Sequence, residues 1–191
     1  MKLLLHVCCG PCMVGTLKAI DRNVHDVTAY WYNPNIHPYQ EYKSRLNSLK
    51  EFVKEIDIPL VADEEYGLRD FIRMVSDDLD NRCDKCYLDR LRQTALKAKE
   101  LDFDGFTSTL LVSPYQKHEF IKAKAEEIAK EVGVAFYYVD PRPYFREGNN
   151  EARNMGQYMQ KYCGCIFSEE ERYLKKYKKK SWKFETTEKV Y

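Results

Sequence analysis

Long hydrophobic runs are absent from this sequence, and none approaches the roughly 18 residues that a membrane-spanning helix needs. The apolar start Leu3–Leu5 ends at His6, is too short for a secretory signal and is followed by no small-residue cleavage site. Charge of one sign is also lacking, since 31 basic and 30 acidic residues give a net charge of +1. A globally basic nucleic-acid binder is therefore not indicated, although a local basic patch is compatible with this total. We expect a cytoplasmic protein with no membrane partner.

Glycine and proline are scarce, with 8 and 7 residues among 191, and no Gly/Ser-rich linker or internal repeat divides the chain. A chain of this length is typical of one compact unit. Within it we expect a Rossmann-like α/β domain over residues 1–150. Residues 151–191 should form a helical C-terminal extension that carries the last cysteine pair and a basic tail.

Hydrophobic patterning alternates between strand and helix at the spacing of βαβ units. This alternation predicts an α/β fold with a mostly parallel sheet flanked by helices. A loop is expected over 140–150, because that segment is rich in Pro, Gly and Asn. A capping box of Ser168 and Glu171 predicts the start of the last helix. The expected strands are 3–7, 27–32, 59–62, 105–111 and 134–139, and the other expected helices are 13–20, 38–56, 67–75, one after Cys86, 117–132 and 151–161.

The seven cysteines fall into three tight groups rather than singly along helix and strand faces. An odd number in a reducing compartment argues against a disulfide framework. Structural cysteines that merely pack as small apolar residues would be scattered. The grouping therefore predicts that most of the thiols bind metal. The groups are Cys8, Cys9 and Cys12; Cys83 and Cys86; and Cys163 and Cys165.

Ligands of an open parallel sheet collect at the carboxyl ends of its strands, so the three groups are expected to meet there. Seven thiols exceed the four of a structural zinc site or of one iron–sulfur cluster, which favours a four-iron cluster plus a neighbouring metal. A zinc-stapled RNA-binding module without catalysis stays as one alternative. A thioredoxin-like dithiol oxidoreductase is another, because Cys9-Gly10-Pro11-Cys12 follows a strand and begins a helix. No phosphate-binding loop of an ATP-dependent tRNA thiolase follows the first strand.

Five ordered motifs resemble those of the QueH-type epoxyqueuosine reductases, and together they cover nearly the whole chain. They are Leu4-Leu5-His6-Val7-Cys8-Cys9-Gly10-Pro11-Cys12; Tyr32-Asn33-Pro34-Asn35-Ile36-His37-Pro38 with Glu41-Tyr42; Cys83-x-x-Cys86-Tyr87-x-x-Arg90-Leu91; Leu110-Leu111-Val112-Ser113-Pro114-Tyr115-Gln116; and Tyr162-Cys163-Gly164-Cys165.

The resemblance implies a HUP-like, Rossmann-type fold and a cobalamin-independent oxidoreductase that reduces epoxyqueuosine to queuosine in the wobble position of a tRNA anticodon. It also implies a four-iron four-sulfur cluster and a second, mononuclear iron. Asp140-Pro141-Arg142-Pro143 departs from the Asp-Phe-Arg expected of the family, but Asp140 and Arg142 are kept.

Removing the epoxide oxygen needs two electrons and two protons and releases water. Side chains cannot supply the electrons, so a metal cofactor and an external electron donor are expected, with the second iron acting as Lewis acid. Which cysteine serves which metal stays open, and Asp140, or less favourably Asp89, is a further ligand candidate. The first candidate for the proton donor is His37, followed by Tyr115, with Tyr87 and His118 also available, whereas His6 and His25 are expected to be structural.

Several residues are predicted to contact the substrate or tRNA. Tyr32 is expected to stack on the base, and Arg142 to contact the substrate. Glu41, Arg45 and Arg90 are predicted to hold the substrate ring or to order the cysteine loops, although each reads equally as an ordinary helix-face charge. A basic stripe with interleaved aromatics, which includes Lys178, Lys179 and Lys180, is predicted to bind the anticodon loop; a solvated terminal helix is the alternative.

Overall fold

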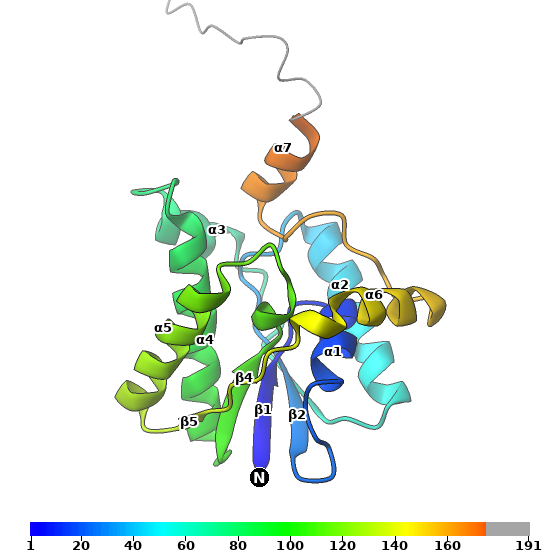
Figure 1. Ribbon diagram of the computed structural model, residues 1–191. Coiled ribbons are helices and arrows are strands. Elements are labelled where there is room, and N and C mark those ends of the chain that lie inside the picture. Colours follow the sequence, from blue (N-terminus) through cyan, green and yellow to red (C-terminus); the bar gives the residue numbers. More distant parts are fainter. Residues whose placement is uncertain (175–191) are drawn as a thin grey trace, which may run out of the picture.

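A five-stranded, all-parallel sheet forms the centre of the molecule in the computed structural model, which describes residues 1–174 (Figure 1). The strand order β3-β2-β1-β4-β5 is that of a Rossmann-type sheet. The predicted α/β fold with a parallel sheet is therefore confirmed. The strands are β1 (Lys2–His6), β2 (Asp26–Trp31), β3 (Leu60–Ala62), β4 (Gly105–Ser108) and β5 (Ala135–Phe136).

Both faces of the sheet are covered, because side chains of a strand alternate between its two faces. Leu3 and Leu5 of β1 pack with the helices on one face, and Leu4 packs with those on the other. The first face carries α1 (Gly10–Leu17), α2 (Tyr39–Glu55) and α6 (Phe145–Asn154), and the second carries α4 (Arg82–Glu100) and α5 (His118–Val132) (Figure 1).

Two shorter helices complete the edge above the carboxyl ends of the strands. Helix α3 (Leu68–Val75) packs against α4, and α7 (Ile166–Leu174) follows the last cysteine pair. Phe71 and Val75 of α3 bury Cys86 and Cys165 in a small core of their own. This core ties the second and third cysteine groups to one end of the fold.

The structure corrects several predicted boundaries. Strand β4 ends at Ser108, because the Ser108 hydroxyl accepts a hydrogen bond from the Leu110 amide and starts a 3-10 turn, Thr109–Val112. The predicted loop 140–150 is wrong: it contains the 3-10 turn Arg142–Tyr144 and most of α6, and the predicted helix 151–161 ends at Asn154. The last helix begins at Ile166, so Ser168 lies within it, where its hydroxyl donates to the Cys165 carbonyl.

Helix α6 forms despite its glycine and asparagines because it packs closely on α1. A Cβ at Gly148 would lie 2.6 Å from the Gly15 Cα, so the two backbones touch where both residues lack a side chain. Ala152 of α6 is fully buried in the core beside α1. Tertiary packing thus overrides a local sequence that is typical of a loop.

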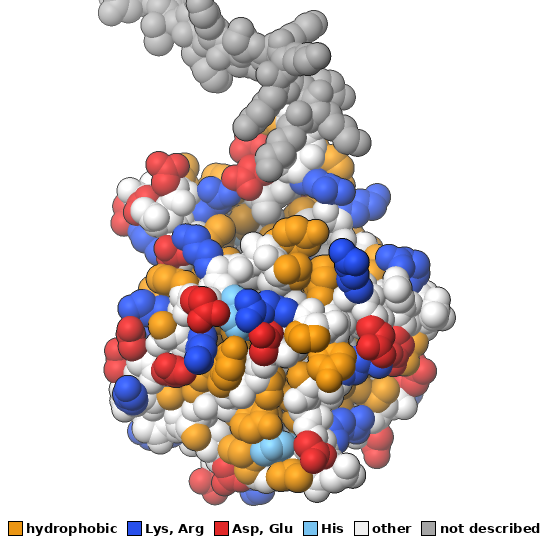
Figure 2. All heavy atoms as spheres, viewed as in Figure 1, with side chains coloured by type: hydrophobic (Ala, Val, Ile, Leu, Met, Phe, Trp, Pro, Cys, Tyr) orange, Lys and Arg blue, Asp and Glu red, His pale blue; other side chains and the backbone are white. Residues whose placement is uncertain are grey.

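Acidic and basic side chains are interspersed over the face of the molecule shown in Figure 2. None of the helices in residues 1–174 is long and apolar enough to cross a membrane.

Candidate metal centre and substrate cavity

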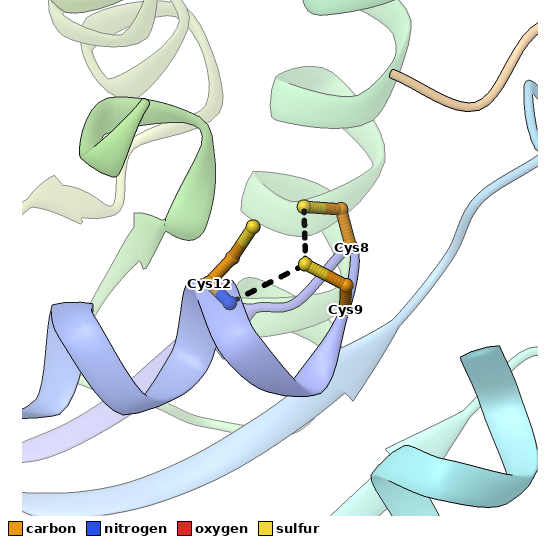
Figure 3. Close-up of side chains that lie close together, drawn as sticks. All are labelled: Cys8, Cys9 and Cys12. Atoms are coloured by element: carbon orange, nitrogen blue, oxygen red, sulfur yellow. Dashed lines mark hydrogen bonds between the residues drawn. The ribbon is translucent and has the colours of Figure 1, made fainter. Parts of the chain in front are cut away.

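Three cysteines converge where β1 ends and α1 begins. Cys8 and Cys9 follow the strand, and Cys12 lies in the first turn of the helix (Figure 3). Their sulfur atoms all lie within 4.8 Å of one another. In the part of the chain that the structure describes, no other group of three or more potential metal-ligating side chains lies so close together. The arrangement suits a metal ion, or three of the four thiolate ligands of an iron–sulfur cluster.

Local backbone geometry places these sulfur atoms. Cys9 is the N-cap of α1, and its Sγ accepts a hydrogen bond from the Cys12 amide at 3.3 Å (Figure 3). Pro11 in the first turn needs no hydrogen-bond partner for its nitrogen. A side-chain amide adds to this arrangement, because Gln160 Nε2 donates to the Cys9 Sγ at 2.9 Å. Exposed amides of a helix N-terminus favour negative charge, so the start of α1 partly offsets the effect of burial on these thiols.

The triad shares its charge unevenly. Hydrogen bonds from the thiols of Cys12 and Cys9 hold the pKa of Cys8 well below its ordinary value. Burial raises the pKa of Cys9, and the hydrogen bond to Cys8 raises that of Cys12. Cys8 is therefore the thiol that ionises first, and the resulting thiolate is the form that binds metal.

The other four cysteines lie on the same side of the molecule but are spread more widely. Cys83 and Cys86 lie in the first turns of α4, and Cys163 and Cys165 precede α7. The charges of Cys163 and Cys165 act on both thiols of α4, so the two pairs are neighbours. Burial raises the pKa of Cys86 to about 12 and also raises that of Cys83. The three groups do lie at one edge of the sheet, because Cys165 packs with Cys86 and Cys163 lines a cavity together with Cys8 and Cys12. Within the described residues, only the triad closes to ligating distance.

A cavity of about 490 Å³ opens between the first and the third cysteine group. Sulfur-bearing residues reach it from opposite ends of the sequence, because Cys8 and Cys12 line it together with Cys163. Its charged lining includes two arginines that are each only 2% exposed, Arg45 and Arg90. The remaining lining residues are Thr109, Leu110, Ser113, Tyr115, Gln116, Phe145, Asn149, Gln160, Lys161, Tyr162, Ser168, Glu171 and Arg172.

Arg45 fastens the loop that carries Cys163. Its two terminal nitrogens donate to the carbonyls of Cys163 and Tyr162, each at 2.9 Å. Glu41, one turn earlier on α2, accepts from the Arg45 Nε at 2.7 Å and forms a buried ion pair with it. Gly164 fits beside them with a φ of +150°, and a Cβ there would lie 3.2 Å from Asn35 and 3.5 Å from Arg45. Glu41 and Arg45 were predicted either to hold the substrate ring or to order a cysteine loop, and these contacts support the second role.

Arg90 lies between the cysteine groups with an unused donor. Its Nε donates to the Cys86 carbonyl, but its Nη2 is buried and has no hydrogen-bond partner within residues 1–174. Burial opposes the positive charge of Arg90, yet the negative charges of Cys86, Cys163 and Cys8 raise its pKa. A buried guanidinium without a full set of partners is costly, so this position fits an anionic group in the cavity.

His37 does not line this cavity. Its Nε2 donates to the Pro34 carbonyl at 2.9 Å, and its Nδ1 accepts from the Ile166 amide at 3.3 Å. Burial lowers the pKa of His37 to about 4, although the bond to Pro34 acts in the opposite direction. The ring also packs against Phe71. This geometry describes a neutral histidine that ties two loops together, and its predicted proton transfer stays a prediction.

Other predicted site residues lie outside the cavity lining. Asp140 is paired with Arg142 through bonds of 2.8 and 2.6 Å to the guanidinium, which holds the pKa of this carboxyl below its ordinary value. The Tyr32 ring is stacked on Tyr30, and its hydroxyl lies 3.5 Å from Asp89. Metal binding by Asp140 and substrate contacts of Arg142 and Tyr32 stay predictions. Lys178, Lys179 and Lys180 lie outside the described residues.

Two glutamines at the sulfur atoms were not predicted as site residues. Gln160 Nε2 donates a hydrogen bond to the Cys9 Sγ, and Gln116 Nε2 donates one to the Cys163 Sγ at 3.5 Å. The Tyr87 hydroxyl donates to Gln116 Oε1 and so fixes which end of the amide faces the sulfur. Gln116 lies in a motif that the sequence singled out, whereas no pattern marked Gln160.

The chain matches the family model described as epoxyqueuosine reductase QueH over residues 3–171. It belongs to this family. A curated QueH relative from Dehalococcoides mccartyi is 39% identical over 174 residues, which cover 91% of this chain and 96% of the relative. A second, from Thermotoga maritima, is 32% identical over 176 residues, which cover 87% of this chain and 89% of the relative. The predicted resemblance is thus confirmed.

Among solved structures, the chain is similar to the U34-tRNA thiolase NcsA from Methanococcus maripaludis with its [4Fe-4S] cluster. The superposition has a TM-score of 0.42 and 12% sequence identity, over 81% of this chain and 65% of that chain. Assignment to the QueH family rests on the sequence matches.

Proposed function

We propose that this protein reduces the epoxide of epoxyqueuosine in the wobble position of a tRNA anticodon, so that queuosine is left at that position of the tRNA. The family match over nearly the whole chain supports this reaction over a zinc-stapled binding module or a dithiol oxidoreductase. The observation that carries the proposal is the cavity in which Cys8 and Cys12 meet Cys163 beside two buried arginines. The reaction consumes two electrons and two protons, converts the epoxide to an alkene and releases water.

The donor set fits an iron–sulfur cofactor. The triad supplies three sulfur ligands within 4.8 Å of one another, and a four-iron four-sulfur cluster needs four thiolates. Arg90, whose buried Nη2 has no hydrogen-bond partner within residues 1–174, supplies positive charge next to such an anionic group. When bound, a four-iron four-sulfur cluster would deliver electrons singly, and a second iron held by remaining thiols would act as a Lewis acid toward the epoxide oxygen. An external donor must replenish the electrons.

The side chains around the cavity order this site. Arg45 donates to the carbonyls of Tyr162 and Cys163, and Glu41 holds the Arg45 side chain in place, so that the exposed Cys163 is kept at the cavity. Gln116 and Gln160 direct N–H groups at sulfur atoms, and such bonds tune the potential of iron–sulfur sites. Of the four candidates for the proton donor, Tyr115 lines the cavity and His37, Tyr87 and His118 do not.

A single-stranded anticodon loop suits this cavity, because its bases can be turned outward without melting a duplex. The wobble base would enter between the cysteine groups, and the rest of the loop would lie on the rim. We also propose that the protein works in the cytoplasm, where reducing conditions keep its cysteines as thiols.

The decisive test is anaerobic purification followed by a single-turnover assay. We expect iron and acid-labile sulfide in the protein, and after addition of dithionite and epoxyqueuosine-containing tRNA the nucleoside should lose one oxygen atom by mass spectrometry. Cys12→Ser, which removes one sulfur of the triad, should lose most of the cluster and the reduction. A colourless protein with stoichiometric zinc, or an iron protein that leaves the nucleoside unchanged, would contradict the proposal.

A further inference from the structure

Two aromatic side chains stand together at the rim of the cavity. Tyr115 follows the 3-10 turn Thr109–Val112, and Phe145 is the first residue of α6. Both line the cavity, and their ring centroids lie 6.1 Å apart with the planes inclined at 80°. The pair therefore joins two segments that are 30 positions apart in the sequence at one lip of the site.

Tyr115 is unusually exposed for a large aromatic residue. Its exposed fraction is 86%, whereas the other exposed large hydrophobic residues in the described part of the chain range up to 61%. An edge-on neighbour covers little of a ring, so a face of Tyr115 is left open to solvent. A single exposed ring is common on protein surfaces, but Tyr115 pairs with Phe145 at a cavity with polar lining residues, and that combination is typical of a binding site.

A short, well-bonded turn holds this ring outward. The Ser113 hydroxyl accepts from the Tyr115 amide at 3.3 Å, and the Ser113 carbonyl accepts from the Gln116 amide at 3.2 Å. Gln116 is in turn bonded to Tyr87 and to Cys163. The turn that presents Tyr115 is therefore connected directly to the wall of the cysteine site, so the backbone that carries the ring is held in place relative to the cavity.

Besides its two buried arginines, the lining of the cavity carries two cations and one carboxylate, and the carboxylate of Glu171 is paired with Arg82 outside that lining. Lys161 and Arg172 line the same cavity, as does Asn149, whose side-chain amide donates to the Phe145 carbonyl at 2.7 Å. Open aromatic faces next to cations are the combination that binds unpaired nucleotides, since bases stack on the rings and phosphates pair with the cations.

We propose that Tyr115, supported edge-on by Phe145, stacks on a nucleobase of the anticodon loop adjacent to the nucleotide that enters the cavity. This assignment rests on the proposed function, because that function supplies the RNA ligand. It gives Tyr115 a binding role in place of the proton donation that the sequence suggested. Stacking uses the ring and not the hydroxyl, and this difference makes the two roles separable.

Binding is tested anaerobically with an anticodon stem–loop RNA that carries 2-aminopurine at either neighbour of the wobble position. Wild-type protein should quench the fluorescence at one of the two neighbours. Tyr115→Ala should abolish that quenching and weaken binding roughly 5- to 150-fold, the range expected for loss of one stacked base. Tyr115→Phe should restore both. Leu96→Ala, an exposed change on α4 away from the cavity lining, serves as the control and should bind as wild type does.

The outcomes separate this proposal from its rivals. Unquenched probes, or equal affinities of Tyr115→Ala and wild type, would overturn stacking. A Tyr115→Phe variant that binds tightly but loses the single-turnover rate would assign proton transfer to the hydroxyl instead. If the wild-type protein quenches the probe but fails to reduce epoxyqueuosine, the proposed function fails while stacking stands, because the binding assay involves no reduction. Iron content of each variant verifies that the site has assembled.

Discussion

Cys9 shows how one residue serves both the fold and the site. As N-cap of α1 it occupies a position where serine, threonine or aspartate is usual, and its sulfur accepts the Cys12 amide. A metal at the triad would share this sulfur with the helix. The helix start and the metal site are therefore coupled, since whatever orders α1 also orders two of the three sulfur atoms.

Replacement of Arg90 by Met should weaken the metal site through charge alone. The buried guanidinium lies within the electrostatic reach of Cys86, Cys163 and Cys8, so its loss raises the cost of each thiolate. We expect lower iron content after reconstitution and, in the fraction that assembles, a midpoint potential tens of millivolts more negative by redox-poised EPR. The conservative Arg90→Lys should recover part of both. Equal potentials in wild type and Arg90→Met would refute an electrostatic role.

At the scale of helices and loops, helix α2 holds the loop that carries the last cysteine pair. The Glu41–Arg45 pair projects from the first turns of α2 and carries the Cys-Gly-Cys loop, so a loop more than a hundred residues away follows the position of that helix. The Tyr158 hydroxyl donates to Glu41 and connects the segment after α6 to the same pair.

Arg45→Met should destabilise the iron-free protein strongly. The change leaves Glu41 buried without its partner and frees two carbonyls, and breaking a buried ion pair typically costs about 3–5 kcal/mol. Urea unfolding of the reduced, iron-free protein measures this loss. Lys50→Met is the matched control, because its partner Glu64 is exposed and such pairs contribute about 1 kcal/mol or less. Similar midpoints for the two variants would show that the buried pair is not needed for stability.

The packing of α1 on α6 gives a second test at this scale. In Gly148→Ala the new methyl group meets the Gly15 backbone, and forced separation of packed elements typically costs about 1–3 kcal/mol. Because α1 carries Cys9 and Cys12, iron content should fall together with stability. Asn154→Ala, on an exposed position of the same helix, should remain within about 0.5 kcal/mol of wild type. Unaltered stability of Gly148→Ala would mean that α6 shifts without cost.

For the whole molecule, the parts predictable from sequence were those with a strong local signal. Hydrophobic runs such as Leu3–Leu5 marked the sheet, and the cysteine spacing marked the metal centre. The first part of α6, over 145–150, was predicted as loop because Gly148 is typical of a loop until α1 is placed beside it. The loop after β2 turns His37 inward toward Phe71, which position along the chain does not reveal. Gln160 was missed because a polar residue that completes a distant site leaves no periodic pattern.

Charge distribution over the whole chain gives the last prediction. The net charge is only +1, so binding of RNA phosphates must depend on local groups of cations rather than on the total. Replacing Lys178, Lys179 and Lys180 by alanine should weaken tRNA binding and flatten its dependence on salt. The slope of log affinity against log salt should fall by roughly 0.7 for each phosphate of a single-stranded region that the variant no longer neutralises.

Three lysines at the edge of the sheet away from the cysteines provide a control of equal charge. Lys54, Lys97 and Lys130 lie in the last turns of α2, α4 and α5, and helices that cross between parallel strands end at the edge away from the cysteines. Alanine at these three positions removes the same charge but should leave the salt slope close to that of wild type. If both triple variants flatten the slope equally, net charge governs the association and Lys178–Lys180 bind no phosphate specifically. If only the first does, those lysines belong to the tRNA interface.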